Sequence, residues 1–162
     1  MSIELVRIDD RLIHGQVVMA WHRACPVDRM VVVDDRAAND AIRKMLLETV
    51  APQGVRVSVL TKKQGADALL TNAYGEERLM LLATTPITLL ALIECGVDLK
   101  AINVGGLGTG PGKRQLTPAV AVDQEEEAAF AELQKLGVQL QIQTIPSDLP
   151  LALSDVLPKR EA

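Results

Sequence analysis

Aromatic side chains are nearly absent from this chain of 162 residues, which has one Trp, one Tyr and one Phe. Hydrophobic residues still make up 48% of the sequence, so the core has to be built from Val, Leu, Ile and Ala. Such a composition is typical of a parallel sheet covered by helices. At this length we expect one domain over residues 1–162, burying about 70% of the surface that the unfolded chain exposes.

Cysteine is also scarce. Cys25 and Cys95 are isolated, and neither has another Cys or a His at metal-ligand spacing. Two thiols buried in a reducing compartment are the simplest interpretation. The sequence therefore indicates neither a disulfide framework nor a metal site, and no cofactor is expected.

Long apolar runs and basic clusters are missing as well. No run reaches the roughly 18 residues of a membrane span, and the start Met-Ser-Ile-Glu lacks the regions of a signal peptide. The net charge of −4, without a stripe of Lys and Arg, argues against binding to nucleic acid. We therefore expect a soluble cytoplasmic protein.

The most informative stretch is residues 7–16, where a short apolar strand leads into charges of both signs and then into a histidine. Imidazole is nucleophilic and exchanges its proton near neutral pH. Arg11 can hold an anion, while Asp9 or Asp10 can fix the tautomer of the His14 ring. This arrangement predicts a phosphohistidine site.

The residues around the histidine also suit a negative ligand. Gly15 leaves space beside the ring, and the predicted helix after it offers free backbone N–H groups. Asp9, Asp10 and Arg11 sum to −1 before a phosphoryl group of about −1.5 to −2 arrives. We therefore expect Arg11 to face the phosphoryl group while an aspartate turns toward the imidazole or the backbone.

Apolar runs alternate with helical patterns along the whole chain. The predicted strands cover residues 3–8, 30–33, 55–60, 79–83, 101–104 and 138–145, with a shorter extended segment at 116–122. The predicted helices cover residues 16–24, 61–70 and 87–93, and two more begin after 40 and after 123. The pattern predicts a doubly wound α/β fold: a mostly parallel central sheet, helices on both faces and an edge strand near the C-terminus.

Two side-chain patterns refine this fold. Ile42, Met45, Leu46 and Leu47 form an apolar face that is expected to bury the second helix. Gln139, Gln141 and Gln143 alternate with apolar residues, so one face of the last predicted strand should be wet. The tail with Pro146, Pro150 and Pro158 is expected to wrap around the domain or fray.

The predicted strands end in polar residues that should meet at one edge of the sheet. These residues are His14 after the first strand, Asp34 and Asp35 after the second, Thr84 and Thr85 after the fourth, and Gly105 and Gly106 after the fifth. If the first and fourth strands are neighbours, the hydroxyl groups of Thr84 and Thr85 can donate to phosphoryl oxygens. Capping of the next helix is an equal alternative.

Residues 105–112 form the most glycine-rich segment. Gly112-Lys113 is followed by Arg114, so the segment is not a Walker A loop, and no clear helix follows to complete a dinucleotide fingerprint. Backbone N–H groups at Gly105 and Gly106 can approach a phosphate, with Lys113 and Arg114 nearby. A flexible connector is the alternative.

The sequence at 7–17, Arg-Ile-Asp-Asp-Arg-Leu-Ile-His-Gly-Gln-Val, followed by Trp21, resembles the start of a known family. This family is the IIB component of the mannose/fructose/sorbose type of the phosphoenolpyruvate-dependent sugar phosphotransferase system. Further stretches follow in the family's order, at residues 32–35, 38–47, 103–106, 112–113, 120–123 and 143–146.

The resemblance implies that His14 accepts a phosphoryl group from a IIA protein and passes it to a sugar delivered by a IIC/IID membrane permease. It places the protein at the inner face of the membrane through these partners. Its oligomeric state is left open, with a homodimer as one option.

Two other classes fit parts of the pattern. A response-regulator-like module would accept phosphate on Asp34 or Asp35 and bind Mg²⁺ with the help of Asp9 and Asp10. A nucleotide-binding module would use the segment 105–112 without chemistry.

Overall fold

The structure is a computed structural model that describes residues 1–157. The strands are β1 (Ser2–Asp9), β2 (Arg29–Val33), β3 (Arg56–Leu60), β4 (Arg78–Ala83), β5 (Ala101–Gly106), β6 (Arg114–Thr117), β7 (Val120–Val122), β8 (Gln139–Ile142) and β9 (Leu151–Ala152). The helices are α1 (Gly15–Ala24), α2 (Asp35–Ala38), α3 (Ala41–Val50), α4 (Lys62–Leu70), α5 (Pro86–Glu94), α6 (Gln124–Lys135) and α7 (Leu153–Val156). The expectation for Pro158 falls outside the described residues.

Seven strands form the central sheet in the order β3-β2-β4-β1-β5-β8-β9. All neighbours are parallel except β8 and β9, which confirms the predicted α/β class. Ile8 of β1 pairs with Ala83 of β4 and with Val104 of β5. The first and fourth strands are therefore neighbours, and the carboxyl end of β1 lies in the middle of the sheet.

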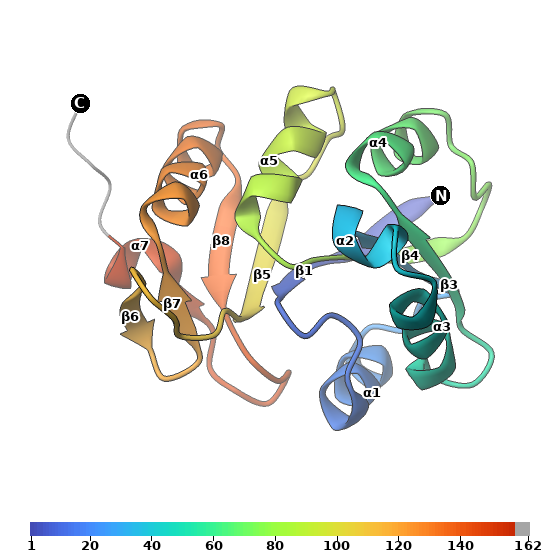
Figure 1. Ribbon diagram of the computed structural model, residues 1–162, viewed down its shortest axis with the longest axis horizontal. Coiled ribbons are helices and arrows are strands. Elements are labelled where there is room, and N and C mark those ends of the chain that lie inside the picture. The colour runs from blue at the N-terminus through green and yellow to red at the C-terminus, as the bar shows by residue number, and fades with distance from the viewer. Residues whose placement is uncertain (158–162) are drawn as a thin grey trace.

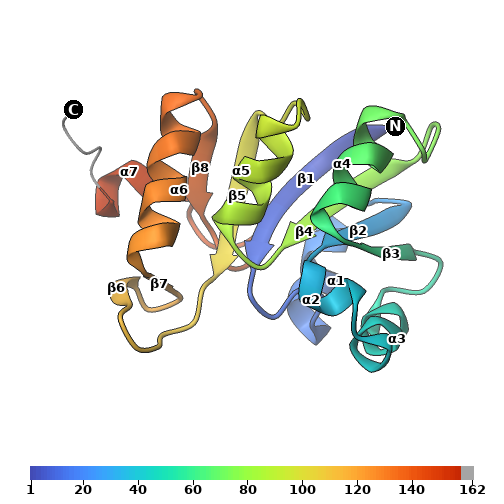
Figure 2. The ribbon, with the colours of Figure 1, turned by 45° about the horizontal axis from the view of Figure 1, so that its top comes forward.

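Helices cover both faces of the sheet, but to different extents. In Figures 1 and 2, α4, α5 and α6 line one face, whereas α1 and α3 lie on the other, at the half formed by β1 to β4. Each face has its own core. One is centred on Leu81, Leu89 and Phe130, and the other includes Trp21 and Leu47. None of the helices within residues 1–157 is long and apolar enough to cross a membrane.

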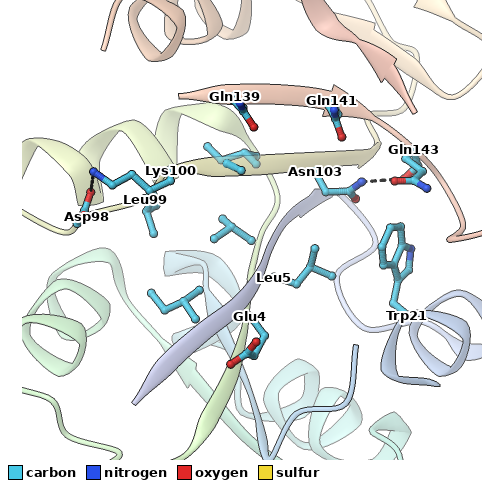
Figure 3. A pocket seen from close by; sticks show the side chains of 14 residues that line it. Glu4, Leu5, Trp21, Asp98, Leu99, Lys100, Asn103, Gln139, Gln141 and Gln143 are labelled. Atoms are coloured by element: carbon cyan, nitrogen blue, oxygen red, sulfur yellow. Dashed lines mark hydrogen bonds and ion pairs between the residues drawn. The ribbon is translucent and has the colours of Figure 1, made fainter. Parts of the chain in front are cut away.

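A hollow of about 330 Å³ lies beside α1, on the part of the sheet formed by β1, β5 and β8. Figure 3 shows Leu5, Asn103 and Gln141 along it, with Trp21 at one side. Gln139 and Gln141 of β8 are exposed while Leu140 and Ile142 are buried, so the predicted wet face is confirmed.

The structure differs from the predicted elements in three places. The edge strand is the two-residue β9, which pairs with β8, rather than the strand predicted over 138–145. Residues 114–122 form an antiparallel hairpin of β6 and β7 instead of one extended segment. The apolar face of α3 was expected to pack into the core, but Leu47 is its one buried residue.

Candidate active site

A tight turn connects β1 to α1 and positions the histidine. The backbone N–H of Leu12 donates to the carbonyl of Asp9 at 2.9 Å. Leu12 has a φ of +59°, a left-handed conformation that is uncommon for a bulky residue. Its side chain is fully buried, and this packing holds the strained turn in place. The turn presents His14 as the residue directly before α1.

Asp9, at the end of β1, is completely buried and is the centre of the site. Its carboxylate lies 3.1 Å from Arg7 Nη2, 3.1 Å from Arg11 Nε and 3.2 Å from His14 Nε2. Burial alone would raise the pKa of Asp9. Hydrogen bonds from Arg11 and His14, together with the charge of Arg7, outweigh that effect and hold the pKa below its usual value. Asp9 is therefore a fixed negative charge behind the imidazole.

Arg7 lies beneath Asp9, and its side chain is only 1% exposed. Its guanidinium donates to the side chain of Asn103 and to the carbonyls of Gln143 and Thr144, the last two at 3.0 and 2.9 Å. Burial lowers the pKa of Arg7, although the charge of Asp9 opposes this shift. The contacts tie the support of the histidine to the end of β8.

Two other residues complete the setting of Arg7. The guanidinium lies over the Trp21 ring, 5.1 Å from its centroid, and the Trp21 indole N–H donates to the carbonyl of Thr144. A Cβ atom at Gly105 would overlap the Arg7 guanidinium. Position 105 therefore has to be glycine for Arg7 to stay where it is.

Arg11 and Asp10 lie on the outer side of the turn. The Arg11 side chain is 53% exposed while still touching Asp9. The Asp10 carboxylate accepts from the backbone N–H of Gly108 at 2.6 Å, where a Cβ atom would come within 2.9 Å of it. Asp9 is therefore the carboxylate that faces the imidazole, and Asp10 is the one that faces the backbone.

The N-terminus of α1 lacks a side-chain cap. Gly15 has a φ of +33°, and the N–H of Val18 donates to the carbonyl of His14 at 3.4 Å. Within residues 1–157, no protein group accepts from the N–H groups of Gly15, Gln16 and Val17. Three amides next to the imidazole are therefore open to an anion.

The chain matches the family model of the sorbose subfamily IIB component of the phosphotransferase system over residues 3–162. It belongs to this family. It is 38% identical to the sorbose-specific EIIB component of Klebsiella pneumoniae, covering 96% of this chain and 94% of that protein. It is 40% identical to the mannose-specific EIIAB component of Escherichia coli K12, covering 98% of this chain but 49% of that longer protein.

Solved structures agree with this assignment. The IIBSor domain of the sorbose permease from Klebsiella pneumoniae superposes with a TM-score of 0.92 at 38% identity, covering 96% of this chain and 95% of that domain. The chain is thus a IIB component of a sugar phosphotransferase system, and its activity is that of a phosphotransferase.

The two threonines of this IIB component have other hydrogen-bond partners. The hydroxyl of Thr84 donates to Asp34 at 3.0 Å, and the hydroxyl of Thr85 caps α5 by accepting from Ile87 N–H at 3.3 Å. Thr85 thus takes the capping role that was one of its two predicted options. A hydroxyl that accepts can still donate its proton. The phosphate-binding role of both threonines stays a prediction.

The glycine-rich segment of the IIB component contacts the turn after β1 through Gly106, whereas the basic residues that follow it bind elsewhere. Gly106 pairs with Asp9, and its carbonyl accepts from the N–H of Asp10 at 3.1 Å. Lys113 and Arg114 instead form ion pairs with Glu126 and Glu127, at 3.0 and 2.5 Å. These two cations hold the β6–β7 hairpin against α6. Phosphate binding at Gly105 and Gly106 also stays a prediction.

The carboxylates that a response-regulator-like module would use, those of Asp34 and Asp35, accept hydrogen bonds from helix N–H groups. Asp34 caps α2 by accepting from Ala37 N–H at 2.8 Å, and Asp35 accepts from Lys62 N–H at 2.8 Å. No group of three or more His, Cys, Asp or Glu side chains in residues 1–157 is placed to hold a metal ion.

Arg7 and Asn103 are the residues of the site that the sequence analysis missed. A signal was present for Arg7, because residues two apart on a strand point to the same side. Arg7 and Asp9 therefore share one side of β1, and this spacing identifies Asp9 as the inner carboxylate.

Proposed function

We propose that His14 of this IIB component accepts a phosphoryl group on Nδ1 from a IIA protein and passes it to a sugar held by a IIC/IID permease. The observation that carries the proposal is the contact of 3.2 Å between His14 Nε2 and Asp9. Since a carboxylate only accepts hydrogen bonds, it favours the tautomer with the proton on Nε2. The lone pair for the attack on phosphorus is then on Nδ1.

The surroundings of the imidazole suit the charge of the phosphoryl group. The exposed Arg11 guanidinium and the free amides of the first turn of α1, beginning at Gly15, provide positive potential. The Asp10 carboxylate is held by Gly108 N–H. In-line phosphoryl transfer needs mainly positioning and charge neutralisation, which these groups provide.

The roles of the residues follow from their positions. Asp9 orients the ring, Arg7 holds Asp9 in place, and Arg11 binds the phosphoryl group. We assign these roles within one IIB-type domain that spans residues 1–162.

The test is intact mass after incubation with phosphoenolpyruvate, the general phosphotransferase proteins and a mannose-family IIA protein. We expect the wild type to gain one phosphoryl group, which acid removes and alkali does not. His14→Ala should gain none. His22→Ala is the matched control, because His22 is the second of the two histidines and lies in the last turn of α1, the helix that His14 precedes.

Two further measurements identify the phosphorylated atom and the type of phosphate bond. In protein labelled with ¹⁵N-histidine, phosphorylation should shift the Nδ1 resonance of His14 rather than Nε2. An alkali-labile phosphate that survives in His14→Ala would indicate an aspartyl phosphate and contradict the proposal.

A further inference from the structure

An unusual group of apolar side chains is exposed on the two helices next to the site. Five of the nine large apolar residues that are exposed within residues 1–157 lie on α1 and α3: Met19, Ile42, Met45, Leu46 and Val50. Ile42 and Met45 are 70% and 58% exposed. Apolar side chains gathered on one surface commonly mark a site of protein interaction.

The four residues on α3 form a continuous line, which we call the α3 stripe: Ile42, Met45, Leu46 and Val50. Their spacing of three, four and eight residues from Ile42 places them along one side of the helix. Three of the four residues that predicted a buried helix face, all but Leu47, thus lie on the surface, and in the structure of residues 1–157 no other element covers the stripe.

The stripe begins near the edge of the sheet that carries His14. Because α3 follows β2 and α2 directly, its first turn lies at the carboxyl end of β2. β2 is two strands from β1, or about 10 Å. Figures 1 and 2 show α1 and α3 on the same side of the sheet, and their inner residues share one core.

Basic side chains outnumber acidic ones around the stripe. Arg36, Arg43 and Lys44 form no ion pair within residues 1–157. Against them stand the carboxylates of Asp40, which caps α3, and Glu48, and the Arg11 side chain is half exposed at the site. A phosphorylated donor brings about −1.5 to −2 of charge to His14. A permease presents a sugar that does not yet carry a phosphoryl group.

We infer that the α3 stripe, with Met19 of α1, is the docking surface for the phosphorylated IIA donor; this inference rests on the proposed function of His14. A standard interface covers about 800 Å² per partner, a disc roughly 16 Å in radius. A donor that places its phosphoryl group against His14 therefore extends over α3. The apolar side chains supply contact area, and the basic residues steer the phosphorylated donor toward His14.

The experiment compares two leucines that are equally exposed. Leu46 of the stripe and Leu136 at the end of α6 are each 55% exposed. Single-turnover phosphoryl transfer to IIB is measured at increasing concentrations of phospho-IIA for Leu46→Lys, Leu136→Lys and wild type, so that half-saturation gives the apparent KM and the maximal rate the apparent kcat. We expect Leu46→Lys to raise the apparent KM for phospho-IIA at least about tenfold with kcat within about twofold, and Leu136→Lys to change neither. Ile42→Ser is a second stripe variant, and circular dichroism verifies the fold of each.

Equal KM values for the two lysine variants would overturn the inference. So would unchanged transfer from phospho-IIA combined with slower sugar phosphorylation by permease membranes, because the stripe would then serve the permease. A stripe variant that converts a dimer into monomers in sedimentation, with KM unchanged, would assign the stripe to a second copy. If the wild type accepts no phosphoryl group, the proposed function itself fails, and this inference fails with it.

Discussion

The N-terminus of α1 differs from the N-termini of the other long helices. A side chain caps each of α3, α4, α5 and α6, with Asp40, Thr61, Thr85 and Asp123 as the capping residues. In α4 the cap is reciprocal, since Gln64 also accepts from the N–H of Thr61. In α1 the residue at this position is His14, whose ring turns away to Asp9.

The difference identifies the start of α1 as the one of these five helix N-termini that no side chain stabilises. A side-chain cap typically stabilises a helix by about 1 kcal/mol. The first turn of α1 lacks this contribution, and its amides stay open, as the proposed binding of a phosphoryl group requires. The buried contacts of Asp9 instead hold the residue before the helix, His14. The following substitutions alter either the site at the uncapped start of α1 or the cap of another helix.

The largest effect is expected from Asp9→Asn, which removes the charge that holds His14 at the uncapped start of α1. Phosphoryl transfer to His14 should slow at least about 100-fold, because an amide no longer fixes the tautomer of the ring. The free energy of unfolding should fall by about 3–5 kcal/mol, because Arg7 remains buried without its counter-charge. Rapid-quench transfer assays and urea unfolding measure the two effects.

Asp10→Asn is the matched control for this prediction, since it changes the neighbouring carboxylate, whose one hydrogen-bond partner among residues 1–157 is Gly108. It should alter transfer and unfolding only slightly. Equal losses in the two variants would contradict the assignment of Asp9 as the orienting residue.

A smaller loss, mainly of function, is expected from Arg11→Ala. Its side chain is half exposed, and buried Asp9 keeps its contacts with Arg7 and His14, so the free energy of unfolding should fall by about 1–2 kcal/mol, less than in Asp9→Asn. Transfer should still fall at least about tenfold, because a phosphoryl group loses its charged donor. Arg23→Ala, an exposed arginine in the last turn of α1, is the comparison variant. Transfer at the wild-type rate in Arg11→Ala would exclude the role.

Thr61→Ala removes the side-chain cap of α4 and tests how much a cap contributes to stability. The free energy of unfolding should fall by about 1 kcal/mol, and the Tm by about 2–4 °C for a chain of this size. The rate of phosphoryl transfer should stay unchanged, because α4 lies on the face of the sheet opposite α1. Calorimetry and the transfer assay together show whether caps affect stability alone.

The smallest effect is a pH dependence at α6. A hydrogen bond from the backbone N–H of Glu126 holds the pKa of Asp123 below its usual value. The cap therefore contributes above about pH 4, the pKa of an unfolded Asp, and the contribution is lost as the pH falls through the lower folded pKa. Asp123→Asn keeps a good cap without a charge. Its unfolding free energy should match the wild type at neutral pH and decline less in acid.

Much of the fold follows from local patterns in the sequence. Thr61, Thr85 and Asp123 each stand directly before a helix, and the apolar runs at 30–33 and 79–83 are strands buried on both faces. The hairpin of β6 and β7 and the two residues of β9 could not be predicted in the same way. These strands are short, and their pairing depends on tertiary contacts rather than on periodicity.

The site could be predicted only to the level of its motif. The stretch from Asp9 to Gly15 contains the right groups, and the spacing of Arg7 and Asp9 on β1 indicates the inner carboxylate, but its contact with the ring depends on the course of the turn. The participation of Asn103 depends on the pairing of β1 with β5, nearly 100 residues away along the chain. The exposure of Ile42 on α3 could not be predicted either, because tertiary packing rather than helical periodicity decides which apolar side chains of a helix are covered.

The contacts of Arg7 with the carbonyls of Gln143 and Thr144 have a consequence for the order of assembly. Arg7 and the turn between β1 and α1 leave the ribosome early, but these partners follow more than 130 residues after Arg7. Arg7 and Asp9 cannot reach their final arrangement until β8 has joined the sheet. A nascent or truncated chain that ends before residue 143 would have His14 and Asp9 but would lack the two carbonyl contacts that hold Arg7 beneath Asp9. Under the proposed function, the fully supported site therefore forms only after the chain has folded as far as residue 144.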